Sequence, residues 1–185
     1  YGAPNQAWWF VDGSMKFRKK RVQNLNYFRM LHDILPDWRG LESVSQFVEF
    51  GGGTGDVAAC LRHLGYSLNH FVVDLPAMNL FHRYWLRYSG VPAVLGREIG
   101  TKFIETVKNG QRSAGLTVLE SSMAQTWTLP NHLDGSLDSS SVFMGTYSFT
   151  EADVGTRERV RPWIEKFELI FIVFWSSWDG NDNDG

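Results

Sequence analysis

A run of glycines after a short, mostly apolar segment is the part of this sequence best suited to hold a ligand. The segment Gln46–Phe50 leads directly into Gly51-Gly52-Gly53-Thr54-Gly55, and a helical pattern follows. Glycine allows positive φ angles and lets a ligand approach the main chain closely. Strand, glycine turn and helix in this order are typical of nucleotide cofactor sites, and Gly53–Ala58 also fits the relaxed dinucleotide pattern. The turn alone therefore leaves the cofactor undecided.

The charges beside the turn favour a cationic cofactor. A dinucleotide would place its pyrophosphate at the N-terminus of the next helix, where Glu49 and Asp56 would repel it. S-adenosylmethionine (SAM) has no phosphate and carries a sulfonium and an ammonium group, which Glu49 attracts. Asp74 ends the next apolar segment, where a carboxylate can accept hydrogen bonds from both ribose hydroxyls of either cofactor. We therefore predict SAM binding by Glu49, Gly51, Gly53, Gly55 and Asp74.

The same residues resemble the first two motifs of the class I SAM-dependent methyltransferases. The matching parts are Glu49–Gly55 and Phe71-Val72-Val73 with Asp74, and a looser similarity extends to Trp175. Three further segments are similar to the sugar O-methyltransferases, namely Asp74-Leu75-Pro76, Tyr84-Trp85-Leu86 and Tyr147-Ser148-Phe149-Thr150-Glu151. Asp-Leu-Pro is also similar to plant phenolic O-methyltransferases, whereas Ala152 departs from the sugar family, which usually has Met there. The resemblance implies methyl transfer to a hydroxyl of a sugar or another small molecule.

A hydroxyl that accepts a methyl group must lose its proton, so a general base is expected near the cofactor. Ligands of open α/β sheets bind beyond the carboxyl ends of the strands, which directs attention to the loop Tyr147–Asp153. Glu151 is the first candidate base, by position and by resemblance, Asp153 is the second, and Tyr147 is a candidate substrate contact. An equally open alternative is that both acids only stabilise the N-terminus of the next helix. The histidines have no metal-ligand spacing, so no metal is expected.

Short apolar segments alternate with helical patterns, which indicates βαβ units and a Rossmann-like, mainly parallel sheet. Strands are predicted at Gln46–Phe50, Phe71–Asp74, Ser141–Thr146 and Leu169–Trp175, and helices at Val57–Leu64, Met78–Tyr88 and Glu151–Phe167. One more strand lies at Val91–Leu95 or Leu116–Leu119, and the second is preferred because its β-branched centre leads into a polar loop. Three regions are expected: a helical N-terminal cap at 1–42, the SAM-binding domain at 43–175, and a disordered polar tail at 176–185.

Composition narrows the classes of function. The formal net charge of -2 gives no bulk attraction for nucleic acid or an anionic membrane. The longest apolar run, Leu169–Trp175, is far shorter than the roughly 20 residues of a membrane helix, so no membrane insertion is expected. The single cysteine, Cys60, cannot form an internal disulfide, which favours the cytoplasm or another reducing interior.

The strand at Leu169–Phe174 is expected to leave an open apolar edge. Methyltransferases of the resembled class cover this strand with a final hairpin, but only ten mostly polar residues follow Trp175. Such edges invite pairing with another chain. We therefore expect a cap from a partner protein, from native residues absent from this sequence, or from the segment Trp8-Trp9-Phe10.

Two other functions stay open. One is a catalytically silent methyltransferase-like domain that serves as a structural subunit of a larger assembly. The other, less favoured because of Glu49 and Asp56, is an NAD-linked oxidoreductase.

Overall fold

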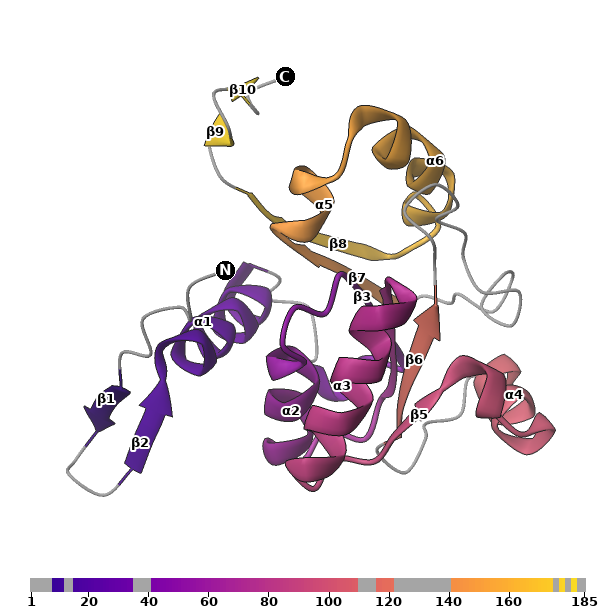
Figure 1. The fold of residues 1–185 in the computed structure, drawn as a ribbon, viewed down its shortest axis with the longest axis horizontal. Helices are drawn as coiled ribbons and strands as arrows, with labels where there is room; N and C mark the ends of the chain where they lie inside the picture. Colours follow the sequence, from indigo (N-terminus) through magenta and orange to yellow (C-terminus); the bar gives the residue numbers. More distant parts are fainter. Residues whose placement is uncertain are drawn as a thin grey trace.

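A six-stranded sheet in which all neighbouring strands run parallel forms the centre of the protein, seen here in a computed structural model (Figure 1). The structure describes residues 8–11, 15–34, 41–109, 116–121, 141–174, 177–178 and 181–182. The strand order is β5-β6-β4-β3-β7-β8. The strands span Gln46–Phe50 (β3), Asn69–Asp74 (β4), Ala93–Leu95 (β5), Thr117–Ser121 (β6), Ser141–Thr146 (β7) and Leu169–Val173 (β8).

Helices flank this sheet, which confirms the predicted Rossmann-like α/β class (Figure 1). One face packs against α1 (Lys19–Ile34), α2 (Asp56–His63) and α3 (Pro76–Tyr88), and the other against α6 (Val154–Ile164). Further elements are α4 (Thr101–Lys108), α5 (Ser148–Glu151) and the 3-10 turns η1 (Leu41–Ser43) and η2 (Gly96–Glu98). No helix among the described residues is both long and apolar enough to span a bilayer.

The apolar residues of β3 pack on both faces of the sheet. Successive side chains of a strand point to opposite faces. Phe47 packs with the helices α1 and α2, whereas Val48 and Phe50 pack with α6. A strand buried on both faces needs apolar side chains at nearly every position. Glu49 is therefore conspicuous, because it is a buried carboxylate one residue before the end of this strand.

The strands β3 and β7 lie side by side, and the chain leaves them in opposite directions. After β3 it passes through α2 to β4 on one side, and after β7 it passes through α5 and α6 to β8 on the other. This arrangement is a topological switch point, where open α/β sheets form a crevice beyond the strand ends. Gly51 and Tyr147 directly follow the two strands and so stand at that crevice.

Two details of the predicted elements are wrong. The sequence predicted one strand at either of two segments, but both are strands, Ala93–Leu95 and Thr117–Ser121, and they pair with one another. The sheet therefore has six strands and not five. The helix predicted at Glu151–Phe167 is two helices, because the chain is extended at Ala152 and Asp153. Glu151 consequently ends a short helix, while Asp153 caps the next one.

The ends of the chain contain short hairpins that the sequence did not suggest. An antiparallel pair, β1 (Trp8–Val11) with β2 (Met15–Arg18), precedes α1 within the region predicted to be a helical cap. In the tail, β9 (Ser177–Trp178) pairs with β10 (Asn181–Asp182). Trp175, the predicted end of the last strand, lies outside the described residues.

Candidate functional site

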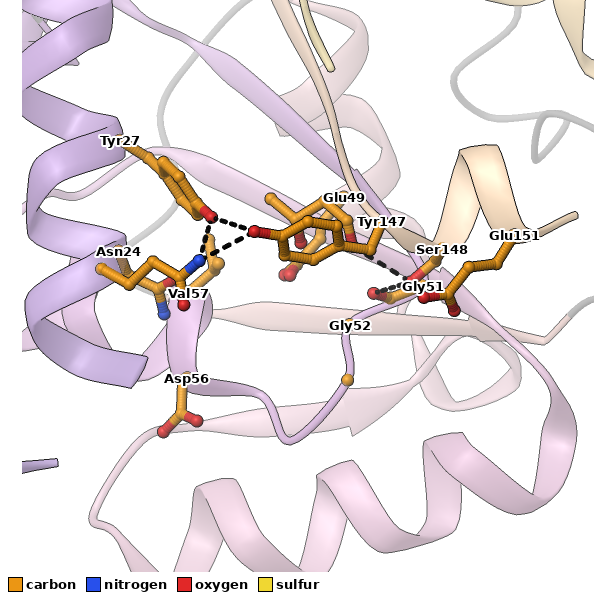
Figure 2. A pocket seen from close by; sticks show the side chains of 13 residues that line it. Asn24, Tyr27, Glu49, Gly51, Gly52, Asp56, Val57, Tyr147, Ser148 and Glu151 are labelled. Carbon is orange, nitrogen blue, oxygen red and sulfur yellow. Dashed lines mark hydrogen bonds between the residues drawn. The ribbon is translucent and has the colours of Figure 1, made fainter. Parts of the chain in front are cut away.

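Two cavities meet at the switch point, one on each side of the glycine turn. The first, of about 230 Å³, lies beneath α1 and is called here the α1 cavity. The second, of about 380 Å³, is called the Asp74 cavity. Four residues line both cavities, namely Gly51, Gly53, Ser148 and Glu151. Figure 2 shows Glu151 and Ser148 beside the glycine turn, with Tyr147 between them and α1.

The glycine turn packs too closely to accept side chains. Gly51 has a φ of +72°, a left-handed conformation that favours glycine, and a Cβ atom there would overlap the side chain of Ser148. At Gly52 a Cβ atom would lie 2.5 Å from Val72 and 2.9 Å from His82. Gly55 is the N-cap of α2 and lines neither of the two cavities. The glycines therefore let the turn pack against Ser148 after β7 and against His82 of α3. The main chain of the turn borders the two cavities.

Asp74 presents a nearly buried carboxylate to the Asp74 cavity. Its residue is only 7% exposed, and its Oδ1 accepts a 2.7 Å hydrogen bond from the backbone N–H of Leu75. Burial raises the pKa of this carboxyl above its ordinary value, although the Leu75 N–H, His82 and the Gly52 N–H oppose that shift. Oδ2 lies 3.7 Å from Nε2 of His82, beyond hydrogen-bond distance. Because a carboxylate has about four acceptor sites, Asp74 can still accept a ligand hydroxyl beside these backbone donors.

His82 connects Asp74 to the glycine turn, a role that sequence reasoning missed. The fully buried ring donates from Nε2 to the carbonyl oxygen of Gly53 at 2.8 Å, and the same nitrogen faces Asp74. A histidine inside an amphipathic helix resembles any core or surface position in sequence. The one sequence feature that could have indicated this role is that His82 lies about two helical turns after Asp74, on the helix that directly follows β4.

Glu49 lines the α1 cavity, on the opposite side of the turn from Asp74. Its residue is 1% exposed, and its Oε2 lies 3.5 Å from Nε2 of His70, which is also buried. Burial, assisted by the positive charge of Arg62, lowers the pKa of His70 well below its ordinary value. His70 is therefore neutral near pH 7 and adds no positive charge beside Glu49.

Tyr147 and Tyr27 face one another across the α1 cavity (Figure 2). Their hydroxyls are 3.1 Å apart, and the side-chain amide of Gln23 donates to both of them. Burial and the bond to Tyr147 raise the pKa of Tyr27 above its ordinary value, so this hydroxyl stays protonated. Tyr147 also has a φ of +64°, a strained conformation for a residue with a side chain. The contact with α1 fixes the predicted substrate residue at the cavity wall.

The two predicted catalytic acids lie close together but in different settings. Glu151 is exposed at the border of both cavities. Asp153 lines only the Asp74 cavity, and its carboxylate accepts hydrogen bonds from the backbone N–H of Thr156 at 2.9 Å and from its hydroxyl at 2.7 Å. These bonds hold the pKa of Asp153 below its ordinary value. The geometry thus favours the capping alternative for Asp153 and leaves Glu151 as the acid at the cavities.

Comparison with known proteins assigns no family. No protein-family model matches the chain, and no curated protein shows a significant match to it. Among the described residues no group of His, Cys, Asp and Glu is arranged to hold a metal ion.

Proposed function

We propose that this protein is a SAM-dependent methyltransferase that acts on a hydroxyl of a sugar or another small molecule. The observation that carries the proposal is the pair of cavities around the glycine turn, with Asp74 on one side and Glu49 on the other. A buried carboxylate on each side suits a ligand with ribose hydroxyls at one end and cationic groups at the other.

Residues of this chain fit each part of the cofactor. A third cavity, of about 450 Å³, borders the carboxyl ends of β5 and β6, and its Pro76, Leu80 and Leu95 suit a flat, apolar base. Asp74 would accept hydrogen bonds from the ribose hydroxyls, and the main chain at Gly51 and Gly53 would lie beside the methionine part. When bound, SAM supplies an electrophilic methyl group on a sulfonium.

Glu151 is the residue proposed to receive the acceptor's proton. The acceptor oxygen would form a bond to the methyl carbon as the methyl–sulfur bond breaks, and the hydroxyl proton would pass to the Glu151 carboxylate. The products are a methyl ether and neutral S-adenosylhomocysteine. Glu151 lines both cavities, so its carboxylate would lie near the middle of the proposed cofactor, where the methyl group would be. The protein would otherwise accelerate the reaction by holding the acceptor oxygen in line with the methyl–sulfur bond, which is the main contribution in displacements of this kind.

Calorimetric titration tests the cofactor directly. We expect S-adenosylhomocysteine to bind, and NAD to bind far more weakly because Glu49 and Asp56 line the space next to the N-terminus of α2. Asp74→Ala should weaken S-adenosylhomocysteine at least tenfold, because hydrogen bonds to a charged group contribute about 1.5–3 kcal/mol. Unchanged affinity in this variant, or tighter binding of NAD, would reject the proposal. Binding without methyl transfer to any hydroxylated acceptor would instead favour the silent structural subunit.

A further inference from the structure

Two buried polar atoms of opposite kind line the α1 cavity without a partner among the described residues. Asn24 of α1 is 2% exposed, and its side-chain amide nitrogen, a donor, makes no hydrogen bond there. Asp56, the first residue of α2, is 4% exposed. Its Oδ2 accepts from the Thr54 hydroxyl, but its Oδ1, an acceptor, has no partner in the same described part. Buried groups of this kind cost free energy unless a ligand or a water molecule meets them.

A hydroxyl group suits this donor and acceptor better than a charged group does. A hydroxyl both accepts and donates, so a single one can accept from the Asn24 amide and donate to the Asp56 carboxylate. An ammonium group only donates and would leave the Asn24 amide unpaired. A phosphate or carboxylate would be repelled by Asp56, and by Glu49 and Glu151 in the same cavity. Among the described residues that line the cavity none is basic, so no side chain there offsets this repulsion.

The reactive end of such a ligand would lie elsewhere in the cavity. Figure 2 shows Asn24 and Asp56 toward α1 and α2, and Glu151, the proposed base, on the other side of Tyr147. A molecule that reaches from the first place to the second needs at least two hydroxyls, one held and one methylated. Tyr27 and Tyr147 also line the cavity and offer aromatic surface together with hydroxyl groups, which suits the apolar and polar faces of a sugar ring.

We propose that the α1 cavity binds the methyl acceptor and that this acceptor is an uncharged polyhydroxylated molecule, such as an unphosphorylated sugar. One of its hydroxyls lies between Asn24 and Asp56, and another lies at Glu151. This inference rests on the proposed function and narrows it, because it separates polyols from phenols with a single hydroxyl and from phosphorylated sugars. Glu49 keeps its proposed role beside the cationic groups of the cofactor.

Acceptor binding to protein saturated with S-adenosylhomocysteine tests the proposal. Methyl α-D-glucopyranoside, methyl α-L-rhamnopyranoside and myo-inositol are neutral polyols. Ligand-detected NMR titrations compare them with glucose 6-phosphate and with guaiacol, a phenol with one free hydroxyl. At least one polyol should bind about tenfold more tightly than either comparison ligand, because the anion is repelled and the phenol leaves one end of the cavity unpaired. A smaller preference, or binding of none of the polyols, would overturn the proposal.

Two variants and a control locate the bound polyol. Asn24→Leu, which keeps a similar shape without the amide, should weaken it about fivefold, the effect of one lost hydrogen bond of about 1 kcal/mol. Asp56→Asn, which removes the charge, should lower the preference for the polyol over glucose 6-phosphate about threefold or more. Asn26→Leu, at an exposed position of α1, should change neither quantity.

Cofactor affinity and folding are measured on the same samples. Every variant should bind S-adenosylhomocysteine within about twofold of the wild type, because none of these changes removes a cofactor contact. The melting temperature of unliganded Asn24→Leu should equal or exceed that of the wild type, because the variant removes a buried donor without a partner. Unchanged polyol affinity in Asn24→Leu would mean that only water meets these atoms, and weakened S-adenosylhomocysteine would assign Asn24 to the cofactor. Either result would overturn the proposal, whereas a wild type that does not bind S-adenosylhomocysteine would reject the proposed function itself.

Discussion

The Ser148 hydroxyl donates a 3.1 Å hydrogen bond to the carbonyl oxygen of Gly51, which joins the loop after β7 to the turn after β3. The two residues are 97 positions apart in the chain, and they form the partition between the α1 and Asp74 cavities. This contact is possible only because residue 51 has no side chain.

A methyl group at residue 51 should therefore damage the fold. Gly51→Ala combines the left-handed penalty of about 1–2 kcal/mol with overpacking of about 1–3 kcal/mol. Gly90→Ala is the matched control, because Gly90 has a similar φ of +76° and a Cβ there meets no described atom within 4 Å. Urea denaturation should show Gly51→Ala to be the less stable variant. Equal losses in the two variants would mean that Ser148 moves aside at no cost.

The buried Asp74 carboxyl should make stability depend on pH. Its pKa is raised in the folded protein, so the folded state holds this proton more tightly than the unfolded state. The resulting stabilisation is complete below the unfolded pKa and is lost as pH rises through the folded pKa. Asp74→Asn cannot titrate, so the stability of the wild type relative to this variant should fall from pH 3.5 to neutrality. Urea midpoints measured in parallel would test this, and an increase over that range would contradict it.

Replacing the proposed base should slow methyl transfer and leave the cofactor in place. For an acceptor that the wild type methylates, Glu151→Gln should lower kcat by about 10²–10⁴, the usual contribution of general base catalysis. Its affinity for S-adenosylhomocysteine should stay within twofold. Glu158→Gln, on the exposed side of α6, is the control and should have wild-type kcat. If Glu151→Gln retains the wild-type kcat, Glu151 is not the general base and only lines the cavities.

The strand β8 should require a cap. It pairs only with β7 in the described sheet, and Ile170 and Phe174 are 43% and 54% exposed. In the isolated chain we expect either rapid hydrogen exchange along β8 or a mass above the 21.1 kDa of one chain. If the wild-type chain associates, Ile170→Lys, which places a charge on the edge strand, should make it monomeric. Slow exchange in a strictly monomeric wild-type chain with a mobile N-terminal segment would show that the edge needs no cap.

The sheet was predictable where strands are buried on both faces. β3 and β7 have the predicted bounds, because each is a short, mostly apolar segment that leads directly into a turn. β5 lies at the edge of the sheet and has only three residues, too few for a periodic signal. The sequence therefore predicted one strand where the structure has both β5 and β6. The β1–β2 hairpin was missed because its strands have four residues each and carry polar as well as aromatic side chains.

The site was predictable only in part, and for a related reason. Glu49 and Asp74 lie at or next to the ends of strands, and parallel strands bring such ends to one edge of the sheet. Asn24 and Tyr27 belong to a helix whose position depends on packing against α2 and the sheet, which no local pattern specifies. The contact of Tyr27 with Tyr147, and the place of Asn24 in the same cavity, therefore had to come from the three-dimensional structure.

The walls of the α1 cavity come from segments that lie far apart in the chain. Gln23, Asn24 and Tyr27 form one wall, and Tyr147, Ser148 and Glu151 form the wall opposite. A growing polypeptide that has not yet emerged past Glu151 lacks one side of the cavity, however well its earlier strands have formed. A fragment that begins after α1 lacks the other side. Ligand binding in this cavity would consequently require both segments to be present and folded against each other.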